Sequence, residues 1–170
     1  MPPQYEGDLV LGSFNFTATL DPVTSTCPGL PDGGFASDAQ LSFSGVFSVA
    51  SQSQTLFLRV NELDRQGTVT AGHFVLVPPF AVERDLGCGL LDFTETLTGD
   101  FTGPTSALDG GACETLYDAD GGCIAPNHVT GFLEDMVHSA DGGGVQGGGG
   151  CAYDAGPSCL FRYVLQGVRQ

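Results

Sequence analysis

The loop Asp118-Ala119-Asp120-Gly121-Gly122-Cys123 places two carboxylates around a tight turn, and this spacing is compatible with a bound metal ion. Calcium binds six to eight oxygen ligands, and an Asp-x-Asp-Gly segment supplies two of them within a few residues. Two more acidic residues, Asp109 and Glu114, lie just upstream. The residues that would hold calcium are therefore Asp109, Glu114, Asp118 and Asp120.

The same loop also fits an ordinary turn. An EF-hand loop needs ligands at its first and twelfth positions, and with Asp118 first the twelfth residue is Val129. Asp-Gly-Gly recurs in four places between stretches of strand-like sequence: Asp32, Asp109, Asp120 and Asp141. Aspartate favours Asx turns and glycine tolerates positive φ, so turn formation explains all four sites. Calcium binding is the alternative, and no other cofactor is expected.

No set of catalytic residues is recognisable. The chain has no Gly-x-Ser-x-Gly motif for a serine nucleophile. The acidic pairs Asp92/Glu95 and Glu134/Asp135 could serve glycoside hydrolysis, but on strands the members of each pair would point to opposite faces. The chain also lacks tryptophan, the side chain most used to stack sugars. A hydrolase with a carboxylate pair is a remote alternative.

Cysteine usage indicates the compartment. The six cysteines are an even set with no Cys-x-x-Cys spacing: Cys27, Cys88, Cys113, Cys123, Cys151 and Cys159. Most lie beside glycine in loop-like sequence, where disulfides crosslink loops in oxidising compartments. Six cysteines allow many pairings; short loops favour Cys113–Cys123 and Cys151–Cys159, which leaves Cys27–Cys88. Six reduced thiols in a cytosolic protein are the alternative.

The charge is strongly negative. Twenty acidic residues face five basic ones, all arginine, for a formal net charge of −15. Such a surface repels nucleic acids and anionic lipid headgroups, so these partners are disfavoured. Cations and basic partners are the compatible ligands. An acidic surface also occurs for solubility alone.

The dominant hydrophobic period is two, which is typical of half-buried antiparallel strands. In residues 10–20, Val10 and the even-numbered positions from Phe14 to Leu20 share one face. Similar alternation runs through residues 40–49, 55–60, 89–101 and 159–168. Residues 68–80 are apolar on both sides and indicate one covered strand, with residues 61–67 as the connection before it. Residues 127–140 fit a helix or a strand, and the alternation favours a strand.

We therefore expect a single all-β domain over residues 1–170. The number of strands, about seven to eight, and the turns between them indicate an antiparallel β-sandwich or a small β-barrel. The loops are long, rich in glycine and aspartate, and crosslinked by disulfides. The most glycine-rich of them covers about 140–158.

These features favour a non-enzymatic, exported domain of the cell envelope or cell surface, which acts by protein–protein interaction, self-assembly or as a structural part. It would lie in the periplasm, on the outer membrane surface or outside the cell. No segment approaches the ~18 apolar residues that span a membrane, but a lipid anchor upstream, as in a mature lipoprotein, fits this picture. A calcium-dependent binding module is the alternative function.

Overall fold

The computed structural model describes residues 7–27, 40–50, 52–79, 82–85, 90–106, 116–117, 119–139 and 159–170, and all regular structure in these ranges is β. The strands are β1 (Leu9–Leu20), β2 (Gln40–Ala50), β3 (Thr55–Val60), β4 (Leu63–Thr70), β5 (His73–Val77), β6 (Val82–Asp85), β7 (Leu90–Thr102), β8 (Thr105–Ser106), β9 (Cys123–Ile124), β10 (His128–Ser139) and β11 (Cys159–Arg169).

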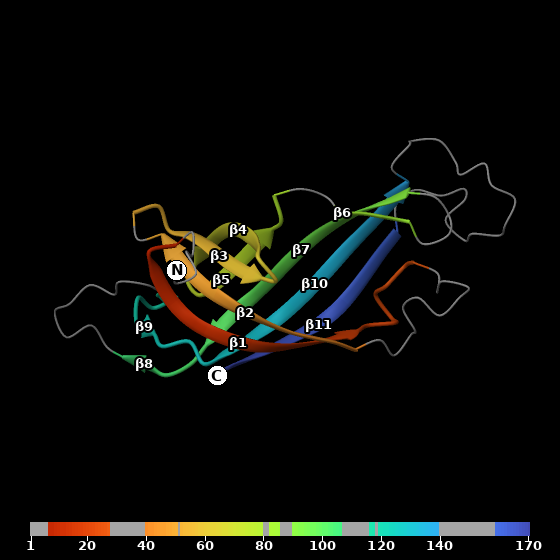
Figure 1. Cartoon of the computed structure of the whole chain (residues 1–170). Helices are drawn as coiled ribbons and strands as arrows, with labels where there is room; N and C mark the ends of the chain where they lie inside the picture. The colour runs from red at the N-terminus through yellow and green to blue at the C-terminus, as the bar shows by residue number, and fades with distance from the viewer. Residues whose placement is uncertain are drawn as a thin grey trace, which may run out of the picture.

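Eight of these strands form a closed antiparallel barrel. Along the chain, β1 to β5 pair in sequence, β5 pairs with β7, β7 with β10, β10 with β11, and β11 returns to β1. The last pairing joins Phe14–Leu20 to Tyr163–Arg169 in an unbroken ladder. Figure 1 shows the long strands β7, β10 and β11 beside the shorter group β3, β4 and β5. Of the two architectures left open by the sequence, the structure is the barrel.

On the edge of β7 that faces away from β10, two different strands pair with β7, one after the other. β5 pairs with residues 97–100 of β7 and β6 with residues 90–93, both antiparallel. Pro78 and Pro79 follow β5 directly, and proline has no N–H to continue a ladder. Within the described part of the chain, residues 94–96 of β7 therefore have no ladder partner on this side.

Phenylalanine rings fill one end of the barrel, which we call the base. The ring centroid of Phe47 lies 4.8 Å from Phe101, 5.4 Å from Phe14 and 5.5 Å from Phe74, in edge-to-face arrangements. Leu116 and Ile124, beside the small β8–β9 sheet, are buried in the same core. The base is thus closed by packed side chains. The opposite end, which we call the mouth, carries the β3–β4 turn.

A β-bulge corrects the expected inward face of β1. Phe14, Phe16 and the following even-numbered positions are buried, as their alternation predicts. Val10 is 54% exposed instead, and Leu11 is buried. The register with β2 shifts between Val10 and Gly12, where φ is +142°. One extra residue reverses the alternation, and the hydrophobic pattern of the sequence does not reveal it.

Two tight turns were also missed. Residues 68–80 do not form one strand: Ala71 and Gly72, with φ of 50° and 78°, turn the chain from β4 into β5. The connection expected over residues 61–67 contains only Asn61 and Glu62 as turn residues, again with positive φ, and β4 begins at Leu63. Both are two-residue hairpin turns, which favour Asn-Gly or Asp-Gly sequences; Ala-Gly and Asn-Glu are weaker signals.

The disulfide at the mouth joins Cys27 to Cys159, with a Cα–Cα distance of 4.8 Å. The expected pairs Cys27–Cys88 and Cys151–Cys159 are therefore wrong. After β1 the chain stays beside β11, where the backbone N–H groups of Thr26 and Cys27 donate to the carbonyl of Leu160. This contact brings together two cysteines that are 132 residues apart. Cys123 is also disulfide-bonded, but the expected partner Cys113 lies outside the described residues.

Hydrogen bonds to the side chain of Asp21 shape the turn that follows β1 and leads to Cys27. The carboxylate of Asp21 accepts hydrogen bonds from the Thr24 hydroxyl at 2.7 Å and from the backbone N–H of Val23 at 3.0 Å. These two bonds hold the pKa of Asp21 below its usual value. The strand ends there, and the turn returns the chain to β11.

Loss of the Cys27–Cys159 disulfide should destabilise the barrel. The double substitution Cys27→Ser/Cys159→Ser is expected to lower the free energy of unfolding by about 2–4 kcal/mol, because the unfolded chain regains the freedom of a long loop. Urea unfolding followed by circular dichroism measures this change. Equal midpoints, or a nonreducing peptide map that links Cys27 to another cysteine, would contradict the assignment.

Candidate functional site

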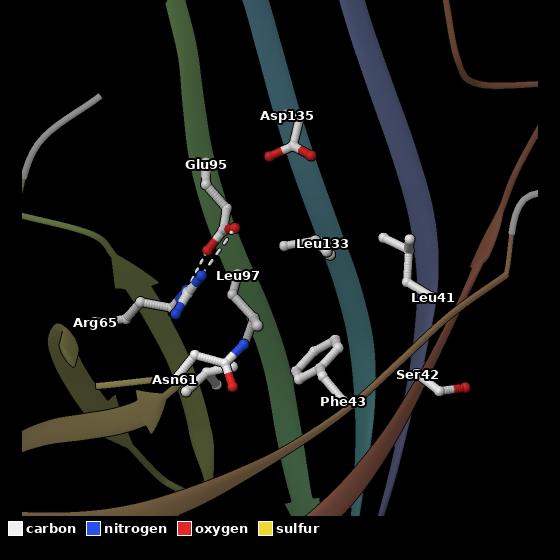
Figure 2. Close-up of a pocket in the computed structure, with 10 residues that line it drawn as sticks. Leu41, Ser42, Phe43, Asn61, Arg65, Glu95, Leu97, Leu133 and Asp135 are labelled. Atoms are coloured by element: carbon white, nitrogen blue, oxygen red, sulfur yellow. Dashed lines mark hydrogen bonds and ion pairs between the residues drawn. The ribbon is translucent and has the colours of Figure 1, made fainter. Parts of the chain in front are cut away.

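A cavity of about 330 Å³ lies at the mouth of the barrel. The residues that line it, drawn in Figure 2, are five apolar and five polar ones: Leu41, Ser42, Phe43, Val60, Asn61, Arg65, Glu95, Leu97, Leu133 and Asp135. This volume falls in the range of small-ligand pockets, roughly 300–1,000 Å³. Eight-stranded barrels can hold one small ligand in this way.

The strand order places the acidic side chains of the cavity on the wall opposite β2. β2 contributes Leu41 and Phe43, and it lies four strands from β7 in either direction around the barrel. The opposite wall, formed by β7 and β10, contributes Glu95 and Asp135 together with Leu97 and Leu133. In Figure 2 these two acids lie across the cavity from Leu41, with Leu133 between them. The cavity therefore has an amphipathic lining.

Packed aromatic rings bound the cavity toward the base. Phe43 stacks on Phe16 with ring centroids 5.0 Å apart, and Phe16 in turn contacts Phe47 at 5.9 Å. Phe16 and Phe47 are almost fully buried, whereas Phe43 is partly buried. Phe43 is thus the point where the filled interior ends and the cavity begins.

Arg65 and Glu95 form an ion pair inside the barrel. Arg65 lies opposite Leu58 in the β3–β4 register, on the inward face. Its Nε donates to Oε1 of Glu95, and its Nη2 donates to Oε2 at 3.1 Å. The side chains are 14% and 20% exposed. The pair joins β4 to β7 at the level where the prolines interrupt the wall between them.

Asp135 is the second acid of the inward wall. In the β7–β10 ladder it lies directly opposite Glu95, and its side chain is partly buried. Directly opposite residues on neighbouring strands have Cβ atoms about 4.5–5.5 Å apart. The two carboxyl-bearing side chains therefore share one face.

The acidic pairs considered from the sequence are separated as expected. Asp92 and Glu134 take the outward positions of their strands, and Glu134 forms an ion pair with Arg162 on the outer surface, with Oε1 3.2 Å from Nε. The pair that the structure brings together, Glu95 and Asp135, was missed. Each acid lies two residues from an apolar inward residue of its own strand, Leu97 or Leu133, which indicates the inward face. The register of β7 against β10 is needed to place the two acids side by side.

The proposed calcium ligands are mostly beyond the part of the chain that the structure describes. Asp109, Glu114 and Asp118 lie outside it, so calcium binding stays a prediction. Asp120 is exposed in a turn in which Gly121 has φ of 84°. Among the described residues, no group of three or more His, Cys, Asp or Glu side chains could hold a metal ion.

Compared with known proteins, the chain matches no family model, no curated protein and no solved structure. The functional argument therefore depends on the barrel and its cavity. Two structural features support the functional proposals. They are the interior cavity with its amphipathic lining, and the outer face of the barrel with its exposed apolar side chains.

The Arg65–Glu95 pair should stabilise the barrel more than the outer Arg162–Glu134 pair. The substitution Glu95→Gln is expected to cost about 2–4 kcal/mol of unfolding free energy, because it leaves a largely buried guanidinium without its counter-charge. Glu134→Gln is the matched control and should cost about 0–1 kcal/mol, since its pair is more exposed. Urea unfolding of both variants tests this. Equal losses would contradict the structural role of the inner pair.

Proposed function

We propose that this protein is a non-enzymatic binding protein that holds a small molecule in the mouth cavity. The observation that carries the proposal is the cavity itself: it is bounded by packed rings toward the base, lined by apolar side chains on both walls, and carries charged side chains on the wall opposite β2. Apolar walls with a few placed polar groups are the usual composition of small-molecule sites. The apolar side chains would contribute affinity and the charged side chains orientation.

The geometry favours binding over hydrolysis. Paired carboxylates are the catalytic groups of most glycosidases, and each must be free to exchange a proton or to attack. Both carboxylate oxygens of Glu95 instead accept hydrogen bonds from Arg65. A group fixed in this way orients a ligand more readily than it reacts with one.

We further propose that the protein works outside the cytosol, in the periplasm, on the outer membrane surface or in the extracellular space. The Cys27–Cys159 disulfide supports this setting, because structural disulfides persist in oxidising compartments. In the described part of the chain, no helix is long and apolar enough to cross a membrane.

The binding proposal is tested with a neutral probe, 2-phenylethanol, titrated into the isotopically labelled protein. Saturable chemical-shift changes are expected at residues 41–43, 60–65, 95–97 and 133–135, with a dissociation constant of about 1 mM, or about −4 kcal/mol. Leu41→Trp should block the cavity and abolish the changes.

Ser44→Trp is the matched control, because Ser44 lies on the same strand with its side chain exposed. It should leave probe binding intact. Shifts that spread over the outer wall, or the same response from both variants, would overturn the assignment of the cavity as the binding site.

A second candidate function is association through the outer wall. Four apolar side chains on the outward faces of β10 and β11 are 37–51% exposed, and we call them the outer patch: Phe132, Met136, Val164 and Val168. Phe132 lies opposite Val164 in the ladder, and the guanidinium of Arg162 lies 3.8 Å from the Phe132 ring centroid. The nearby charges, Glu134 and Arg162, neutralise each other. A near-neutral apolar area suits contact between two copies of an otherwise acidic chain.

Self-association should therefore appear at high protein concentration and increase with salt, because salt screens the repulsion between two chains of charge −15. Sedimentation velocity measures it. Phe132→Ser/Val164→Ser should remain monomeric, whereas Val10→Ser, an exposed position on β1, should behave as wild type. A monomer under all conditions would contradict this second function.

A further inference from the structure

We infer that the ligand of the mouth cavity is an uncharged molecule, with an aromatic or apolar body and one O–H or N–H group that donates to the carboxylate of Glu95. This inference rests on the proposed binding function and adds the chemical class of the ligand. It follows from the partners that the charged side chains of the lining already have, from the hydrogen-bonding capacity that they keep, and from the position of the apolar side chains.

The charged side chains of the lining already have partners. Arg65 and Glu95 hold each other in a two-point ion pair, and Asp135 has an interaction of its own. A charged ligand would lose its hydration and then compete for groups that are already engaged. Burial of a charge is unfavourable unless a counter-charge and hydrogen bonds compensate it. The lining therefore favours a ligand without a formal charge.

An anionic ligand has the least favourable contacts. Two nitrogens of the Arg65 guanidinium donate to Glu95, and the third, Nη1, is buried and exposes almost no surface. A carboxylate or phosphate in the cavity would therefore lie near the acidic side chains without a reachable donor from Arg65. The formal net charge of −15 also lowers the local concentration of anions.

The ion pair keeps the capacity to accept a hydrogen bond. A carboxylate has about four lone-pair sites, and the two hydrogen bonds from Arg65 use one at each oxygen of Glu95. The Glu95 side chain is partly exposed and lines the cavity. An O–H or N–H group of the ligand can therefore donate to Glu95 while the bonds from Arg65 stay in place. An ether oxygen, which only accepts, would find no equivalent donor at the pair.

The apolar body of the ligand has matching side chains across the barrel. Phe43 lies on β2, four strands from β7 and Glu95 in either direction. Its ring stacks on Phe16, and Leu97 lies between Phe43 and Glu95 in Figure 2. A ring packed against Phe43 and Leu97 would continue the aromatic packing of the base and direct an attached hydroxyl toward β7. The geometry therefore suits an aromatic alcohol or a molecule of similar shape.

The test compares four probes that share a phenyl ring on a short linker: 2-phenylethanol, its methyl ether, 2-phenylethylammonium and phenylacetate. Chemical-shift titrations of the labelled wild-type protein measure each affinity at neutral pH and physiological salt, which screens the long-range attraction of cations. We expect the alcohol to bind about tenfold more tightly than the ether, a ratio that corresponds to about 1.4 kcal/mol, because only the alcohol has a donor. Both charged probes should bind more weakly than the alcohol, and phenylacetate most weakly.

Two matched double substitutions locate the hydrogen bond. Arg65→Met/Glu95→Leu replaces the inner ion pair by apolar side chains, an exchange that proteins often tolerate without loss of stability. It should remove the preference for the alcohol over the ether. Arg162→Met/Glu134→Leu makes the same exchange at the outer ion pair and should keep the tenfold ratio. If the inner variant does not fold, the comparison of the four probes on wild-type protein needs no variant.

The outcomes separate the inference from the function on which it rests. If the alcohol binds in the cavity but the ether binds equally well, or a charged probe binds more tightly, the inference is wrong and the binding function stands. If none of the four probes binds, both fail. A preference for the alcohol that the inner variant keeps and the outer variant removes would place the hydrogen bond on the outer wall and overturn the assignment to Glu95.

Discussion

Closure of the barrel is the constraint on which the rest of the structure depends. Once β7 pairs with β10 and β11 with β1, the interior is about as wide as the side chains that fill it. Every inward position must then match its neighbours in size. Large rings on one strand face glycines on others: a Cβ on Gly99 would lie 2.9 Å from the ring of Phe74, and a Cβ on Gly167 would lie 2.6 Å from Phe16. The aromatic base needs these glycines for space.

The same closure explains why charged groups lie inside. Beyond Phe43 toward the mouth, the short strand β5 ends at two prolines. Inward positions at this level carry Arg65 and Glu95, which connect β4 to β7 by side chains where no backbone ladder does. A buried ion pair seldom stabilises a fold better than apolar packing would. The pair lies at the edge of the cavity, which suits the ligand-orienting role proposed for it.

Strand alternation was enough to predict the class of fold and most inward residues. It also correctly predicted a strand over residues 127–140, where the apolar residues fit a helix as well. What local pattern does not contain is the pairing of distant strands. Whether a set of such strands forms a sandwich or a barrel depends on whether the last strand reaches the first, here through the pairing of β11 with β1.

The errors have the same origin. The pairing of Cys27 with Cys159 requires that the segment after β1 lies along β11, so a preference for short loops chose the wrong partners. The candidate site was missed because Glu95 and Asp135 become neighbours only through the register of β7 with β10. The bulge near Gly12 and the turn at Ala71 depend on local φ values that the residue types there only weakly favour.

The period of two along β10 also lets one strand serve two surfaces. Asp135 faces the mouth cavity, whereas its neighbours Glu134 and Met136 belong to the outer wall. A substitution on one face therefore leaves the side chains of the other in place, provided that the ladder survives. The proposed ligand binding and the proposed self-association can therefore be tested separately in a single barrel, and effects that always changed together would indicate a disturbed β10 rather than a lost contact.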